Sequence, residues 1–242
     1  MTRELVYGRR PAREVIRAGR RQILELYATE RALGSEPWLR DETGLRIHVE
    51  REGRLNELAG SRDHQGVVAL CEPYRYADAY ELAAGEQPLI ACLDQVTDPH
   101  NLGAVCRTAE VAGATGVVIP ERRSAEVTPA VCKASAGAVE HLPVARVRNL
   151  ADFLAAAKEA GCWCYGASAD ATTPYDRPDY RGGVVLVLGA EGKGLRPRVA
   201  DACDDLVALP VRGRIASLNV SAAAAALVYG ILQRRAELDS AS

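Results

Sequence analysis

Aromatic residues, lysine and long apolar runs are scarce in this 242-residue sequence. Aromatic residues make up only 5%, which argues against a nucleic-acid site built on several stacked rings. Lys133, Lys158 and Lys193 are the only lysines, so arginine, whose planar fork suits phosphate, carries most of the positive charge. No apolar run reaches the roughly 18 residues of a membrane span, and the N-terminus lacks the apolar core of a signal peptide. We expect a soluble, cytoplasmic protein with no membrane partner.

The cysteines lack the spacing of a zinc or redox site. Their number, seven, is odd, no CxxC occurs, and most lie within apolar runs. Cys162 and Cys164 would share one face of a strand, but no histidine lies near them in the sequence. Buried free thiols in a reducing cytosol fit this pattern best, and we expect no metal.

The near-neutral total charge hides an uneven distribution. The 30 basic and 32 acidic residues leave a net charge of −2, which gives no long-range attraction to nucleic acid. Residues 1–24, however, hold seven Arg and two Glu, a net charge of +5. The total therefore excludes a uniformly basic protein, but not an RNA enzyme that concentrates arginine locally. Further arginines lie near the polar loops described below: Arg107, Arg196, Arg198, Arg212 and Arg214.

The pattern of apolar segments predicts an α/β protein with two domains. Residues 1–72 read as a small α/β domain, 73–88 as a polar, Pro-flanked linker with room for one helical turn, and 89–242 as a larger domain. In the larger domain, continuous apolar strands alternate with helices, which indicates a parallel sheet covered on both faces. The expected strands are 22–27, 44–49, 66–71, 89–93, 116–119, 141–147, 162–167, 183–188 and 206–209, and the expected helices are 9–21, 102–112, 129–138, 150–160 and 217–236.

Ligands of parallel sheets bind in the loops at the carboxyl ends of the strands. The loop 94–103 leads into a helix that carries Arg107, and Asn101 there fits either a helix cap or a site residue. The loop 209–221 poses the same choice for Ser217 and Asn219. Each residue alone could be a cap, but three such loops in one domain favour a site.

The loop 189–195 contains three glycines, which permit positive φ and close approach of the backbone to a ligand. It matches neither the P-loop nor the GxGxxG pattern, so a nucleotide-binding fold of those types is unsupported. Glu191, at the tip of an apolar strand, is difficult to explain as a turn residue and is a candidate for the site.

Three segments resemble the ordered motifs of the SpoU/TrmH branch of the SPOUT RNA methyltransferases: Asp98–Ala109, Leu188–Gly194 and Ser217–Ser221. The resemblance spans 89–236. It implies methyl transfer from S-adenosylmethionine to a ribose 2′-OH. The N-terminal segment, with Tyr7-Gly8 and His64-Gln65-Gly66-Val67, resembles the L30e-like RNA-binding domain of this branch. The combination looks most like the bacterial 23S rRNA guanosine-2′-O subgroup.

This resemblance also implies a deep trefoil knot, a homodimer with a site completed across subunits, and roles for individual residues. The implied catalytic residues are Asn101, Arg107, Glu191, Ser217 and Asn219. Cofactor contacts, largely through the backbone, fall at Gly189, Leu209 and Leu218, with Glu191 and Gly192 beside them. The RNA contacts fall at Arg9, Arg10, His64, Gln65 and Arg107.

The reaction itself needs alignment and help with one proton. A ribose 2′-OH is a poor nucleophile, and correct orientation can contribute ~7–11 kcal/mol. Arg107, with a pKa above ~12, is a poor base, so we expect it to hold a substrate phosphate and stabilise the alkoxide while phosphate or water takes the proton. The alternatives are a tRNA 2′-O-methyltransferase, an rRNA methyltransferase that confers antibiotic resistance, and a non-catalytic RNA-binding relative.

Overall fold

The computed structural model describes residues 2–240, which group by contacts into two units. The N-terminal unit contains the chain up to Arg75 together with Glu126–His141. The C-terminal unit contains Tyr76–Ala125 and the chain from Leu142 onward. The segment 126–141 thus groups with the N-terminal unit, although the predicted larger domain, 89–242, includes it. The boundaries 1–72, 73–88 and 89–242 stay a prediction as functional domains.

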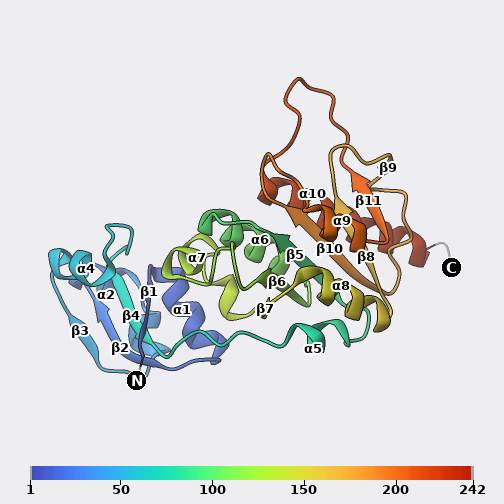
Figure 1. Cartoon of the computed structure of the whole chain (residues 1–242). Coiled ribbons are helices and arrows are strands. Elements are labelled where there is room, and N and C mark those ends of the chain that lie inside the picture. Colours follow the sequence, from blue (N-terminus) through green and yellow to red (C-terminus); the bar gives the residue numbers. More distant parts are fainter. Residues whose placement is uncertain (1, 241–242) are drawn as a thin grey trace. The chain divides into compact units, whose positions relative to one another are not determined.

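The N-terminal unit is built on a mixed sheet with strand order β1-β4-β2-β3 (Figure 1). Strand β4 pairs antiparallel with both β1 and β2, and β2 pairs parallel with β3. The elements are β1 (Glu4–Tyr7), α1 (Arg9–Ala18), β2 (Ile23–Ala28), α2 (Glu30–Ser35), α3 (Trp38–Asp41), β3 (Ile47–Val49), α4 (Glu52–Ala59), β4 (Val67–Cys71), α7 (Pro129–Ala134) and the 3₁₀ helix η1 (Ala138–Glu140).

A buried ion pair fixes the segment 126–141 within this unit. The side chains of Arg21 and Glu140 are 3% and 1% exposed, and Arg21 Nε donates to Glu140 Oε2 at 3.0 Å. Arg21 Nη1 also donates to Glu4 Oε2 at 3.1 Å. A buried charge is tolerated only when it is paired and hydrogen-bonded, so these contacts require η1 to lie beside β1 and the turn after α1.

The C-terminal unit is built on a seven-stranded sheet with the order β7-β6-β5-β10-β8-β11-β9, in which every recorded pairing is parallel. The elements are α5 (Ala79–Ala83), β5 (Leu89–Asp94), α6 (Pro99–Val111), β6 (Gly116–Pro120), β7 (Val144–Val147), α8 (Leu150–Glu159), β8 (Cys162–Ala167), β9 (Thr173–Pro174), β10 (Gly183–Gly189), α9 (Pro197–Ala202), β11 (Asp205–Ala208) and α10 (Val220–Ser240).

Helices cover both faces of this sheet. Phe153 and Leu154 of α8 pack with Val185 and Val187 of β10 in the core on one face, to which α5 and α9 also contribute. Side chains alternate along a strand, so Leu186 and its neighbours point to the other face, where α10 contacts β10 and α6. Burial on both faces explains why the strands read as continuous apolar runs.

The predicted parallel sheet is confirmed, with strand boundaries mostly within one to three residues of those expected. The expected strand 44–49 is shorter, because only 47–49 pair with β2, and the expected helix 129–138 ends at Ala134. All seven cysteines are free, and six are buried. No helix among residues 2–240 is long and apolar enough to cross a membrane. The trefoil knot stays a prediction.

Candidate active site

The three predicted loops all leave the sheet at the carboxyl ends of strands. Strand β5 leads to α6 and β10 to the glycine-containing loop 189–195, while β11 leads to the segment 209–219 before α10 (Figure 1). Strands β5 and β10 are direct neighbours, with Asp94 paired to Gly189 at their ends. Parallel topology therefore brings residues nearly 100 positions apart to one edge of the sheet.

One carboxylate joins these loops. Glu191 Oε1 accepts a hydrogen bond from Asn101 Nδ2 at 3.0 Å and another from Asn219 Nδ2. Asn219 Nδ2 also donates to Asn101 Oδ1 at 3.0 Å, and the backbone N–H of Val220 lies 3.5 Å from Glu191 Oε1. Three of the five predicted catalytic residues thus form one hydrogen-bonded cluster. The cluster is accessible to a ligand because Glu191 and Asn219 are exposed and Asn101 is only half-buried.

The structure shows which of the polar residues in these loops are helix caps. Asp98 caps α6 by accepting the N–H of His100 at 2.9 Å, so Asn101 lies within the first turn and is not the cap. Asn219 does cap α10: its Oδ1 accepts the N–H of Ser221 at 2.8 Å. Asn219 therefore serves both as a helix cap and as a member of the cluster. Ser217 lies outside the helix.

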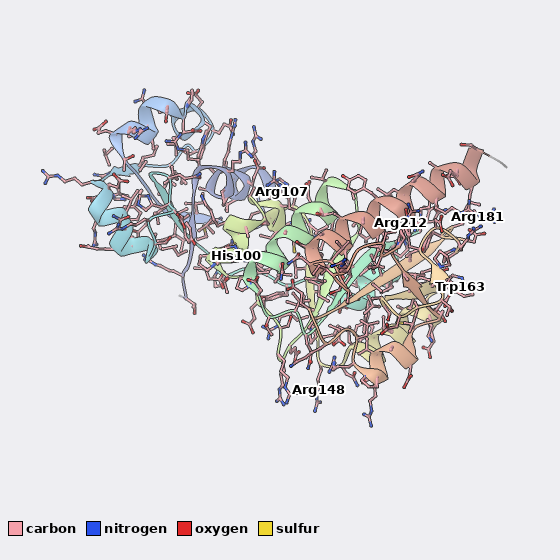
Figure 2. The ribbon with its side chains drawn as sticks, turned by 90° about the horizontal axis from the view of Figure 1, so that it is seen from above. His100, Arg107, Arg148, Trp163, Arg181 and Arg212 are labelled. Carbon is pink, nitrogen blue, oxygen red and sulfur yellow. The ribbon has the colours of Figure 1, made fainter. Side chains whose placement is uncertain are left out.

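Arg107 and Ser217 stand apart from the cluster. Arg107 is exposed on α6, six residues beyond Asn101 (Figure 2), and its side chain makes no ion pair or hydrogen bond within residues 2–240. Ser217 is also exposed, and its side chain has no hydrogen-bond partner in the described chain. Both are thus available to an incoming ligand.

The residues assigned to the cofactor lie in loops whose backbone N–H and C=O groups can bind a ligand. A Cβ on Gly189 would be 2.2 Å from the carbonyl carbon of Gly194, so only glycine permits the loop to close this tightly. Gly192 and Gly194 have φ of +73° and +64°, which favours glycine. Within the described chain, residues 209–218 form no backbone hydrogen bonds, which leaves N–H and C=O groups to bind a ligand. Leu209 is half-buried and Leu218 is 54% exposed. These features fit a cofactor held mainly by backbone atoms.

A second carboxylate, not expected from the sequence, anchors the glycine-containing loop. Asp94 at the end of β5 is fully buried, and its Oδ2 accepts the backbone N–H of Arg196 at 2.8 Å. Arg196 Nε donates to Asp94 Oδ1 at 2.7 Å. The sequence did contain a signal for this contact: an acidic residue ends an apolar strand, and an arginine lies just beyond the loop.

The residues assigned to RNA in the N-terminal unit have two different environments. Arg9 donates to the carbonyl of Gln65 at 2.9 Å and to Glu36 at 2.9 Å, while Arg10 is exposed. His64, in contrast, is only 1% exposed.

His64 holds the turn in place. Its Nε2 bonds to Asn56 Oδ1 at 2.9 Å, and its Nδ1 accepts the N–H of Gly66 at 2.9 Å. His64 thus has a structural role, because both ring nitrogens are used inside the unit, and its contact with RNA stays a prediction.

Comparison with known proteins identifies the family. The model of the SpoU rRNA Methylase family matches residues 88–229, and the model for RNA 2′-O ribose methyltransferase substrate binding matches residues 5–77. The fold and these matches define an RNA 2′-O-ribose methyltransferase. The chain belongs to the SpoU rRNA methylase family.

Individual relatives extend over nearly the whole chain. The 23S rRNA (guanosine-2′-O-)-methyltransferase RlmB of Vibrio cholerae is 35% identical and covers 97% of this chain and 98% of its own length. Among solved structures, the SpoU methyltransferase AviRb from Streptomyces viridochromogenes has a TM-score of 0.83 with 26% identity and covers 97% of this chain and 90% of its own. The AdoMet-bound rRNA methyltransferase from Sinorhizobium meliloti has a TM-score of 0.80 with 25% identity and covers 96% and 87%.

Proposed function

We propose that this protein methylates the ribose 2′-OH of a guanosine in 23S rRNA, with S-adenosylmethionine as the methyl donor. The observation that carries the proposal is the hydrogen-bonded cluster of Asn101, Glu191 and Asn219, which unites three loops at the carboxyl edge of the sheet. The likeness to RlmB of Vibrio cholerae over almost the full length supports 23S rRNA as the substrate.

The cofactor is assigned to the backbone groups of Gly189, Leu209 and Leu218, beside Glu191 and Gly192. S-adenosylmethionine supplies a methyl group on a sulfonium, which is already a good leaving group. The residues of this chain therefore need to align the ribose oxygen with that methyl carbon, an effect that can contribute ~7–11 kcal/mol. Asn101 and Asn219, held by Glu191, are assigned to orient the ribose and the loops, together with Ser217.

Arg107 is assigned to the substrate side of the reaction. Its guanidinium is exposed and unpaired within the described chain, so it can hold a substrate phosphate through two parallel hydrogen bonds. Its positive charge also stabilises the negative charge that develops on the 2′-oxygen. The proton of the 2′-OH passes to water or to phosphate, because a guanidinium stays protonated at neutral pH.

We also propose that the enzyme is a cytoplasmic homodimer whose partner subunit completes the site. Exposed apolar side chains on the contacting helices α6 and α10 support this assembly: Val111 is 65% exposed and Tyr229 49%. Ile215 and Leu218, in the segment before α10, are also exposed. Light scattering coupled to gel filtration measures the assembly, and a monomer at micromolar concentration would contradict it.

A ribose-methylation map tests the function. The map compares rRNA and tRNA from cells with and without the gene. Loss of a single 2′-O-methyl mark from 23S rRNA is expected, whereas a change confined to tRNA would replace the proposal by the tRNA alternative. Calorimetry with S-adenosylmethionine tests the remaining alternative, since no binding at millimolar cofactor would indicate a non-catalytic RNA-binding relative.

A further inference from the structure

Three arginines outside the family motifs lie along the edge of the sheet that carries the active site. Arg122 and Arg123 follow β6, and Arg148 follows β7. We propose that these three residues, the edge arginines, bind the phosphate backbone of the substrate RNA beside the target nucleoside. This inference rests on the proposed function and assigns the path of the RNA strand across the C-terminal unit.

Strand pairing places Arg122 and Arg123, after β6, next to Arg148, after β7. Strands β6 and β7 are parallel, with Pro120 opposite Val147. The backbone N–H of Glu121 donates to the carbonyl of Val147 at 2.9 Å, which continues the pairing to the ends of the strands. Arg122 and Arg148 therefore leave the sheet from neighbouring positions on the same edge.

The loop after β6 also reaches the loop that leads into α6. The N–H of Ala125 donates to the carbonyl of Val96 at 2.9 Å, and Ser124 Oγ lies 3.3 Å from the same oxygen. Val96 is two residues before Asp98, the cap of the helix that carries Asn101 and Arg107. The edge arginines thus extend from the catalytic loop outward over β6 and β7. Neighbouring strands lie about 4.8 Å apart, so β5 and β7 are separated by about 10 Å, a span that can meet more than one phosphate.

The charges of the edge arginines are available to a ligand. All three residues are exposed, and none makes an ion pair within residues 2–240. Arg196 and Arg181, in contrast, are paired with Asp94 and Asp179. Free guanidinium groups beside a site that must receive an RNA strand suit the bidentate recognition of phosphate.

Figure 2 shows where this edge lies. The labelled His100, at the start of α6, and Arg148 lie toward one end of the sheet, whereas Trp163 and Arg181 lie toward the opposite end. Trp163 is near the start of β8, and Arg181 precedes β10, so the second pair marks the amino ends of the strands. Arginines near that amino end provide a natural control.

The test compares two double variants of the full chain that remove the same charge. Arg122→Ala with Arg148→Ala removes two edge arginines. The control, Arg181→Ala with Arg234→Ala, removes two arginines near the amino ends of the strands: Arg181 precedes β10, and Arg234 is next to Arg235, which donates to the carbonyls of Tyr180 and Gly182. Binding to a 23S rRNA transcript is measured at several salt concentrations, and transfer from labelled S-adenosylmethionine is measured with the same RNA.

For the edge variant, we expect the Kd and KM for RNA to rise on the order of tenfold, as the loss of two charge-assisted contacts would give. The slope of log binding against log salt should become shallower by about 1.4, at about 0.7 per phosphate on a single strand. The KM for S-adenosylmethionine and the Tm should not change.

The outcomes separate this inference from the proposed function. Equal RNA affinities for the edge variant and wild type, or equal losses in both double variants, would overturn the role of the edge arginines. Selective loss of RNA affinity in the edge variant supports that role. If wild type then transferred no methyl group to the transcript, the reaction assignment would fail while the RNA path stood.

Discussion

Arg196 binds both oxygens of the buried Asp94 carboxylate, one through its backbone N–H and the other through its guanidinium. The contact joins residues 102 positions apart and fixes the far end of the glycine-containing loop to the end of β5. It therefore couples the stability of the sheet edge to the shape of the loop assigned to the cofactor.

Removal of this guanidinium should lower both stability and cofactor affinity. Arg196→Ala leaves the buried carboxylate of Asp94 with only its backbone donor, and we expect a loss of about 1–3 kcal/mol in the free energy of unfolding. Urea unfolding measures that loss, and calorimetry measures binding of S-adenosylmethionine. Arg198→Ala is the matched control, because Arg198 is exposed and unpaired within the described chain. Equal effects of the two substitutions would show that the Asp94 contact contributes nothing.

Substitutions at Asn219 should separate its role as a helix cap from its role in the site. Asn219→Ala removes the cap of α10 and should cost about 1 kcal/mol of stability. Asn219→Ser supplies another good cap and should restore that stability, but serine cannot bridge Asn101 and Glu191 as the amide does. We therefore expect both variants to have low methyl-transfer rates. Recovery of the wild-type rate in the serine variant would reduce Asn219 to a cap.

Arg107→Lys should lower kcat without altering the fold. Lysine keeps the charge but loses the planar fork, and loss of a donor at a developing oxyanion costs roughly 100-fold in rate. Because Arg107 is exposed, the free energy of unfolding should change by less than about 0.5 kcal/mol. Single-turnover methylation of RNA gives the rate, with Arg181→Lys as the control for an exposed arginine elsewhere. Near-full activity of Arg107→Lys would rule out a role for the fork.

Acidification should destabilise the N-terminal unit through His64. Burial lowers the pKa of His64, and the hydrogen bonds with Asn56 and Gly66 need the neutral ring, with the proton on Nε2. The unfolded chain binds a proton near pH ~6.5, so this stabilisation is present above that pH and is lost as the pH falls below it.

The measurement uses Trp38, which is buried in this unit, as the fluorescent reporter after Trp163→Phe. Unfolding free energies from pH 7.5 to 5.5 should fall more steeply with His64 than in a His64→Gln variant. Parallel pH profiles for the two proteins would show that His64 does not contribute.

The sequence allowed prediction of much of the C-terminal sheet because two-sided burial makes its strands continuous apolar runs. Strand β8, for example, has the boundaries expected for it, Cys162–Ala167. The short elements α2, α3 and β1 were not expected, because four to six residues show too little periodicity to distinguish a helix or strand from a loop.

The candidate site was predictable where residues fit a known motif. It was less predictable where contacts with residues distant in the sequence determine the role of a side chain. Asn101, Glu191 and Asn219 meet as the three-loop argument expects. His64 looked like a surface residue, since nothing in a polar turn reveals that its ring would be buried and hydrogen-bonded to Asn56. The edge arginines were missed because Arg122 and Arg148 follow strands whose loops carry no motif, although their position after parallel strands was a usable signal.

The pairing of Arg21 with Glu140 has a consequence for dissecting this protein. The N-terminal unit consists of two separate segments of the chain, one that ends at Arg75 and one that runs from Glu126 to His141. The unit is therefore connected to the rest of the chain at three points and not through a single linker. A fragment cut after residue 77, where the match to the substrate-binding family model ends, would leave Arg21 without Glu140 and without η1. Recombination or gene truncation at that point would thus divide one folding unit, and an autonomous module would have to carry both pieces of chain.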